Sequence, residues 1–167
     1  MADNLNFSAG NTYNLFNCGA VAGTGFSFTS TATTNAVING KFTATLGAQT
    51  NAATPTVDGT TNLPFNALPP GNCCSLVFGV TSNGTMQMCQ GKVIATGAGS
   101  GNTPGSLIND PQFPGLPNDF CPLAYTVVRT APTASPWTPG ASAWTATGVV
   151  ASTFQNVAQL QNRPQAQ

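Results

Sequence analysis

Segment 73–95, CCSLVFGVTSNGTMQMCQGKVIA, constrains the fold more than any other part of the chain. Two apolar-rich runs flank Asn83-Gly84, the dipeptide that most readily occupies both positive-φ positions of a type I′ turn, so the segment predicts a β-hairpin. A two-residue loop would place Phe78 opposite Cys89. On that register one face carries Cys74, Leu76, Phe78 and Val80, and the other carries Ser75, Val77, Thr81, Met86, Met88, Gln90 and Lys92. The first face is apolar and predicts a second layer that covers it.

Two further dipeptides of this kind indicate hairpins nearer the N-terminus. Asn39-Gly40 lies in a stretch rich in Thr and β-branched residues and predicts Val37 opposite Phe42. Asp58-Gly59 predicts a shorter hairpin in which 56–57 pair with 60–61. Three hairpin signals in the first half of the chain favour an all-β fold.

The second half alternates strands with proline-rich connections. Residues 63–72 and 109–122 contain prolines that cannot donate to a ladder, so we expect them to run along an edge or a surface. Residues 123–129, LAYTVVR, predict a strand with Leu123, Tyr125 and Val127 on one face. Residues 144–160 predict one or two late strands, although the spacing of their apolar residues also fits a short helix.

These elements predict an all-β, single-domain antiparallel β-sandwich or barrel with an extended N-terminal arm and Pro-rich loops. A chain of 167 residues is long enough for one such domain. We expect residues 1–22 to form an N-terminal arm or first strand, 23–160 the β domain, and 161–167 an extended C-terminal tail.

Charge is the unusual feature of the composition. Charged residues make up 5% of the chain, against about 25% in an average soluble domain, and the formal net charge is zero. Such a surface suits an assembly better than dilute solution. Four scattered bases are too few for nucleic acid, and no apolar run reaches the length of a membrane span, so neither is an expected partner. The start of the chain lacks the features of a secretory signal, which predicts synthesis in a cytoplasm.

Five cysteines, an odd number, are expected to be buried free thiols in a reducing compartment. A disulfide formed later and a zinc site are the alternatives. The absence of a CxxC pair and of histidine argues against zinc, and we predict no metal and no cofactor.

The sequence also excludes most catalytic constellations. Without histidine, neither a Ser-His-Asp nor a Cys-His arrangement is possible within this chain. Asp110 and Asp119 could form a carboxylate pair, but both stand where turns begin. The glycine-rich stretch 97–105 lacks the lysine of a phosphate-binding loop. We therefore predict that the protein is not an enzyme.

Two tryptophans bracket a loop rich in Pro and Gly. Trp137 and Trp144 could pack over one end of a β-sandwich, contact another protein, or serve with Tyr125 as a platform for sugar rings.

Four strings in this chain together resemble small structural proteins from the virion gene clusters of tailed bacteriophages. The strings are INGKFTATL at 38–46, SLVFGVTSNGTMQMCQGKV at 75–93, FPGLPNDFCPLAYTVVR at 113–129 and TFQNVAQLQNRPQAQ at 153–167. Their order along the chain carries the resemblance. The chain departs from the pattern at Ala124, where Gly is common, and in its longer, Asn-rich N-terminus.

The resemblance implies a non-enzymatic capsid decoration, cement or head-fibre protein. We expect a virion protein on the outside of a phage capsid, assembled as a homotrimer and bound to the major capsid protein. The alternatives are a tail or fibre component and a carbohydrate-binding β module. The expected contact residues are Phe7, Tyr13, Phe113, Leu116, Phe120 and Trp137.

Overall fold

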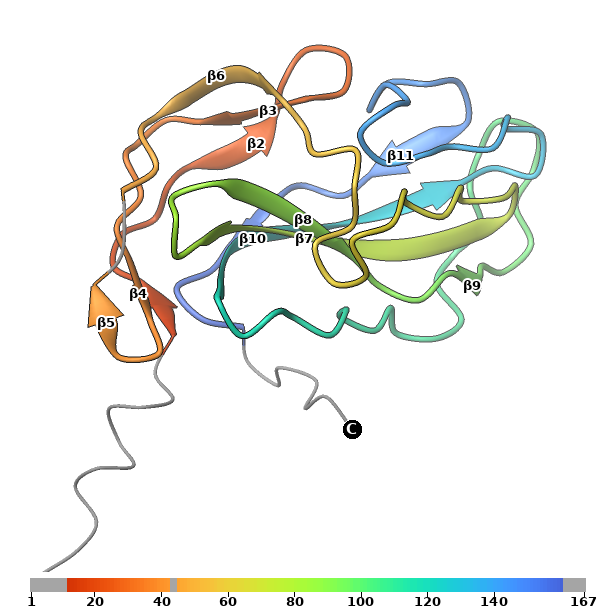
Figure 1. Ribbon diagram of the computed structural model, residues 1–167. Coiled ribbons are helices and arrows are strands. Elements are labelled where there is room, and N and C mark those ends of the chain that lie inside the picture. The colour runs from red at the N-terminus through yellow and green to blue at the C-terminus, as the bar shows by residue number, and fades with distance from the viewer. Residues whose placement is uncertain (1–11, 43–44, 161–167) are drawn as a thin grey trace, which may run out of the picture.

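The computed structural model describes residues 12–42 and 45–160, and over these residues the chain is all-β with antiparallel strand pairing (Figure 1). This confirms the predicted fold class. The strands form layers of open sheets, and no closed barrel is present among the described residues. The strands are β1 (Tyr13–Asn14), β2 (Ala20–Ala22), β3 (Ser27–Ser30), β4 (Ala36–Ile38), β5 (Lys41–Phe42), β6 (Gln49–Ala53), β7 (Asn72–Thr81), β8 (Met86–Gln90), β9 (Ile94–Ala95), β10 (Phe120–Thr130), β11 (Val149–Ala151) and β12 (Gln155–Asn156).

The two longest strands, β7 and β10, form the centre of the largest sheet. They pair from Thr81 opposite Phe120 to Cys73 opposite Arg129, and the sheet has the order β11-β10-β7-β8. Strand β9 pairs with the first residues of β7, and β12 pairs with β10. Almost every side chain of β7 is buried, which requires cover on both faces of the sheet.

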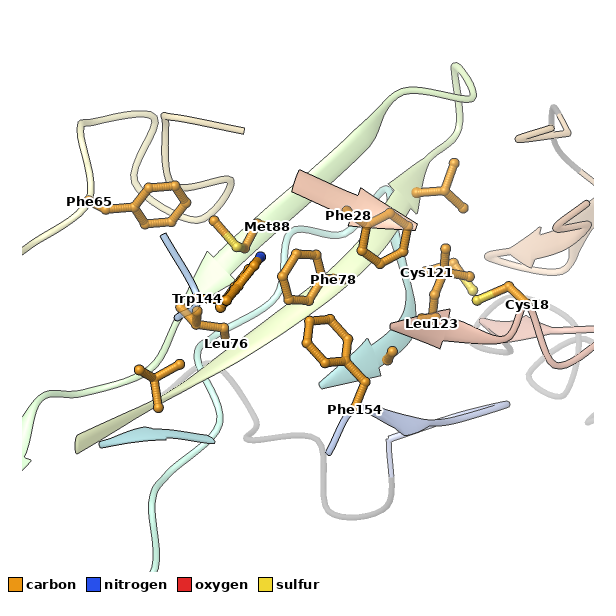
Figure 2. Close-up of a cluster of buried hydrophobic side chains, with 14 of the residues drawn as sticks. Cys18, Phe28, Phe65, Leu76, Phe78, Met88, Cys121, Leu123, Trp144 and Phe154 are labelled. Atoms are coloured by element: carbon orange, nitrogen blue, oxygen red, sulfur yellow. The ribbon is translucent and has the colours of Figure 1, made fainter. Parts of the chain in front are cut away.

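The sheet β2-β3-β6 covers the first face of the central sheet (Figure 1). Phe28 on β3 stacks on Phe78 of β7, with ring centroids 5.2 Å apart. Phe154 contacts the same Phe78 ring at 5.1 Å, and Figure 2 shows Phe78 between these two phenylalanines. The layer predicted over the apolar face of the central hairpin is therefore supplied by residues distant in sequence.

The second face is covered by residues 109–119 of the proline-rich segment, as expected for an extended chain along a surface. The prediction was wrong for residues 120–122, which pair with β7 as the start of β10. Phe113 packs edge-on against Tyr125 of β10, with centroids 4.9 Å apart. The Ser75 hydroxyl donates to the Gln112 carbonyl at 2.6 Å. Phe113, Leu116 and Tyr125 pack against a small buried cluster. The cluster is formed by Val77, Cys89, Phe120 and Leu160.

The register predicted for the central hairpin is wrong by one residue. Phe78 lies opposite Met88, and Val77 opposite Cys89. The Gly84 amide donates to the Thr81 carbonyl at 2.9 Å, and only Gly84 has a positive φ, 75°. The loop is thus three residues long, a type I turn followed by a left-handed glycine.

The changed register exchanges the faces of β8. Met88, Met86 and Gln90 lie on the same side as Phe78, and Met88 is fully buried in the main core. The predicted register would have placed Met88 on the opposite face and Cys89 beside Phe78. Because a one-residue slip turns every side chain over, burial of the larger Met side chain favours the observed register.

Of the other two predicted hairpins, the one at Asn39-Gly40 is confirmed and the one at Asp58-Gly59 is wrong. At Asn39-Gly40 both φ values are positive, 52° and 76°, and Val37 lies opposite Phe42 as predicted. At Asp58 the predicted two-residue loop is absent. The Asp58 amide instead donates to the Leu63 carbonyl at 2.9 Å, which closes a wider loop.

Strand β10 confirms the strand predicted at 123–129 but not its face pattern. Pro122 lies opposite Gly79, and the next paired residue, Ala124, lies opposite Phe78, so Leu123 is an extra residue in a β-bulge. Leu123 therefore faces the main core, while Tyr125 faces the other side of the sheet. A proline is tolerated within a strand at such a bulge.

Both ends of the described chain form short strands. Within the predicted N-terminal arm, residues 12–22 contribute strands β1 and β2, which pair with β4 and β3. Residues 1–11 and 161–167 lie outside the described residues. The late strands predicted at 144–160 are confirmed as β11 and β12, and no helix occurs in the described part of this segment.

Candidate interaction surface

A row of three apolar side chains, two exposed and one half-buried, lies on the small sheet formed by β1, β4 and β5. Tyr13 pairs with Val37, and Val37 pairs with Phe42, so the three side chains share one face across three strands. Phe42 is 66% exposed and Tyr13 37% exposed. We call Tyr13, Val37 and Phe42 the aromatic row.

The reverse face of this sheet holds the row in place. Asn14, Ala36 and Ile38 alternate with the row residues and are buried. The Asn14 amide donates to the Ala158 carbonyl at 2.7 Å, which ties β1 to the C-terminal part of the domain. The row is consequently part of a fixed sheet, with one side in the core and the other in solvent.

More apolar surface follows directly after β1. Leu15 is 41% and Phe16 60% exposed. The Asn14 side chain bonds to both backbone groups of Phe16, donating to its carbonyl and accepting from its amide, and the Leu15 amide donates to the Asn35 carbonyl at 2.9 Å. These bonds fix the backbone of the turn that carries the two exposed side chains.

The segment that carries the row is almost without charge. From residue 12 to residue 57 the sequence contains a single charged residue, Lys41. Clustered exposed apolar groups with so little charge around them are typical of surfaces that become buried in an assembly. The arrangement offers a binding surface, with no group suited to catalysis in the row.

The six residues predicted as contacts fall into different places. Tyr13 is in the aromatic row. Phe113 and Leu116 are half-buried, because they pack on the small cluster beneath segment 109–119. Phe120 and Trp137 are 0% and 1% exposed, so both are core residues without surface for a partner. Phe7 lies outside the described residues.

The two tryptophans pack inside the domain, which was one of the three interpretations of their spacing. Trp137 and Trp144 contact each other with centroids 5.4 Å apart. The Trp137 indole donates to the Ala143 carbonyl at 2.9 Å, and the Trp144 indole to the Ser27 carbonyl at 2.8 Å. Since both rings are covered, neither presents a face on which a sugar could stack.

Sequence reasoning missed Phe42 as a surface residue. The signal was available in part, because the type I′ turn correctly placed Val37 opposite Phe42. The pairing of Tyr13 with Val37 joins segments that no turn connects closely, so no local pattern revealed the three-stranded row.

All five cysteines are buried free thiols, as predicted. Burial raises the pKa of the Cys74 thiol to about 12, against a partial opposing effect of its hydrogen bond with Gln90. Burial likewise raises the pKa of Cys89 to about 11 and raises the pKa of Cys18 and Cys73. Because the thiolate is the reactive form, these thiols should be inert in the folded protein.

We expect the free energy of unfolding to fall as the pH rises above about 9. In the unfolded chain the Cys74 thiol ionises near its ordinary pKa of 9.0, whereas the buried thiol keeps its proton up to about 12. The unfolded state therefore binds fewer protons in this range, so rising pH favours it. At pH 10.5 Cys74 alone should cost about 2 kcal/mol, since each pKa unit corresponds to about 1.4 kcal/mol.

Urea denaturation at several pH values checks this expectation. Cys74→Ala should lose less stability between pH 8 and 10.5 than the parent chain, because it lacks the thiol whose pKa burial raises. Equal losses in the two proteins would contradict a contribution from Cys74.

The remaining candidate groups form no reactive cluster in the described residues. Asp110 and Asp119 are exposed. Asp58 is buried, and its carboxylate accepts a hydrogen bond from the Thr60 amide at 2.9 Å, which is a structural role in the 58–63 loop. Over residues 12–42 and 45–160 there is no group of three potential metal ligands. The same residues contain no helix with the length and apolarity needed to span a bilayer.

Comparisons with family models, with curated proteins and with solved structures found no match to this chain.

Proposed function

We propose that this chain is a non-enzymatic virion structural protein that binds the outside of a tailed-phage capsid as a decoration or cement protein. The observation that carries the proposal is the aromatic row, which belongs to a segment, 12–57, with a single charged residue. The resemblance of four ordered strings to phage virion proteins supplies the kind of assembly.

The aromatic row is the contact that we propose for the capsid shell. Three apolar side chains on a rigid sheet can bury their area against a partner without ordering a loop, so little conformational entropy is lost on binding. Tyrosine and phenylalanine are among the residues enriched at interface cores. Lys41 is the only charged residue in strands β1, β4 and β5, so few matching charges are needed on the shell.

The first experiment is to measure the number of copies of this chain relative to the major shell protein in purified particles, by quantitative mass spectrometry. A protein that follows the symmetry of a head lattice should be present at on the order of hundreds of copies. A few tens or fewer would overturn the decoration model in favour of a tail or fibre component. Absence from particles would overturn the virion assignment and leave a separate binding module.

A point variant tests the contact itself. Particles stripped of this protein should recover heat resistance when the parent chain is added back, and Phe42→Asp should lose at least about tenfold in binding, because a charge would be buried. Leu63→Asp is the matched control, since Leu63 is 63% exposed but lies in a loop outside the sheet β1-β4-β5. Equal binding by both variants would contradict a role for the row.

A further inference from the structure

An apolar groove lies between two strands that are edges of different sheets. Strand β2 is the edge of the sheet β2-β3-β6, and β11 is the edge of the central sheet. The groove has a volume of about 480 Å³, and its walls include Val21 and Ala22 of β2, Val149–Ala151 of β11, and Phe154. No charged residue lines it.

The edge of β2 has unused backbone hydrogen-bonding groups. The Gly23 amide donates to the Ser27 carbonyl of the neighbouring strand at 2.9 Å, so the peptide groups of Ala22, one residue earlier, point away from β3. At Ala20 the corresponding outward groups are satisfied by the Asn156 side chain, which accepts from the Ala20 amide at 2.7 Å and donates to its carbonyl at 3.2 Å. Within the described residues no such partner serves Ala22.

The edge of β11 is open in the same way. Ala131 donates to the Gly148 carbonyl at 2.7 Å, and Ser152 donates to the Val127 carbonyl at 2.8 Å. The alternation of an antiparallel ladder therefore turns the peptide groups of Ala151 away from β10 and toward the groove side. In the part of the chain that the structure describes, nothing bonds to them.

Two open strand edges with an apolar floor between them form a site for an additional β-strand. Main-chain hydrogen bonds to the edges would supply affinity, and alternate side chains would enter the floor. An inserted strand with apolar residues at every second position and no charge would match the lining.

The N-terminal segment of this chain has that pattern. Residues 5–9, LNFSA, alternate Leu5, Phe7 and Ala9 with the polar Asn6 and Ser8. Residues 1–11 precede the described part of the chain and could extend about 36 Å, at about 3.3 Å per residue. We propose that residues 4–10 of a second copy of this chain add as a β-strand between β2 and β11, with Phe7 in the groove.

The placement of β1 favours a second copy as the source of the strand. Tyr13 of β1 pairs with β4, and Figure 1 shows β4 and β5 at the opposite end of the molecule from β11. The segment that leads into β1 would have to double back across the domain to reach the groove of its own chain. The uncharged apolar surface around β1 is also suited to contact between copies.

Cysteine trapping on the purified full-length chain tests this arrangement without any capsid, so its failure is separate from a failure of the proposed function. The five natural cysteines are buried, which keeps the background low. A Phe7→Cys chain is mixed with an Ala22→Cys chain that carries a mass tag, because Ala22 is exposed, lines the groove and lies opposite the core residue Phe28. The expected product is a disulfide-linked dimer of the two different chains under mild oxidation.

The control mixture replaces Ala22→Cys with Leu63→Cys, an exposed position outside the groove, and should give little mixed dimer. Equal dimer in both mixtures would overturn the proposal. A Phe7→Cys, Ala22→Cys double variant that cross-links only within one chain would also overturn it, because the chain's own segment would then occupy the groove.

Self-association measured by light scattering is the second readout. The parent chain should be oligomeric, and both Phe7→Asp and Ala22→Asp should raise the dissociation constant at least about tenfold while circular dichroism stays unchanged. Ala22 is exposed, and the unchanged circular dichroism spectrum of each variant checks that folding is retained. A parent chain that stays monomeric at the highest concentration tested, or variants that associate as well as the parent, would overturn the proposal.

Discussion

Phe78→Ala should lower the free energy of unfolding by about 3–5 kcal/mol, the range found for removing a buried aromatic side chain. Phe78 is fully buried and contacts Phe28, Phe154 and Trp144 at ring-centroid distances of 5.2, 5.1 and 6.2 Å. It is therefore the residue through which the two sheets and the late segment touch (Figure 2). A loss of this size is a large part of the 5–15 kcal/mol that stabilises an ordinary domain.

Urea denaturation followed by tryptophan fluorescence measures the effect, since Trp144 reports directly on this cluster. Phe42→Ala is the matched control, because it removes the same ring from a position that is 66% exposed. The control should change stability by no more than about 0.5 kcal/mol. A Phe78→Ala loss below about 1 kcal/mol would mean that the sheets do not pack through this ring.

The same Asn-Gly signal led to a correct register at one hairpin and a wrong one at another. At Asn39-Gly40 both residues adopt positive φ and the loop contains two residues. At 83–84 only Gly84 does so, and the loop has three. The dipeptide fixes where a chain turns, but the core decides which register buries the larger side chains, and that information is not local.

The layering of the fold also depends on contacts that a linear pattern does not reveal. Composition and proline placement predicted the all-β class, the strand in segment 123–129 and the extended course of residues 109–119. The pairings of β1 with β4 and of β10 with β7 join distant segments. For that reason the sequence left three positions open for the tryptophans: the core, an interface or a sugar-binding site. Only the packing in the structure shows that they belong to the core.

Neutral side chains perform much of the hydrogen bonding in this domain. The Gln90 amide donates to the Asn66 carbonyl and accepts from the Asn66 amide, both at 2.9 Å, as a neighbouring strand would. Asn156 pairs with Ala20 in the same manner. An amide side chain can replace a peptide group without the desolvation cost of a charge. The scarcity of charged residues is thus consistent with a fold whose irregular edges are closed by Asn, Gln and Thr.

Gly79→Ala should destabilise the domain by about 1–3 kcal/mol or more through steric overlap at the β10 bulge. A Cβ atom on Gly79 would lie 2.3 Å from the Cys121 carbonyl oxygen and 2.3 Å from Cζ of Phe120. The carbonyl belongs to a strand paired over most of the length of β7, so it cannot move aside easily. The backbone of Gly79 is not in the left-handed region, so the expected cost comes from space and not from φ.

Two comparisons isolate that cause in urea denaturation. Gly47→Ala places the same methyl group where no atom lies within 4 Å, and it should be neutral or slightly stabilising because alanine restricts the unfolded chain. Adding Phe120→Leu to Gly79→Ala removes the ring contact but leaves the carbonyl contact, so the double variant should lose less stability than the sum of the single losses. If the two losses simply add, the Phe120 ring does not restrict position 79. At the bulge, β10 would then lie farther from β7 than the 2.3 Å distance between a Cβ at position 79 and Cζ of Phe120 implies.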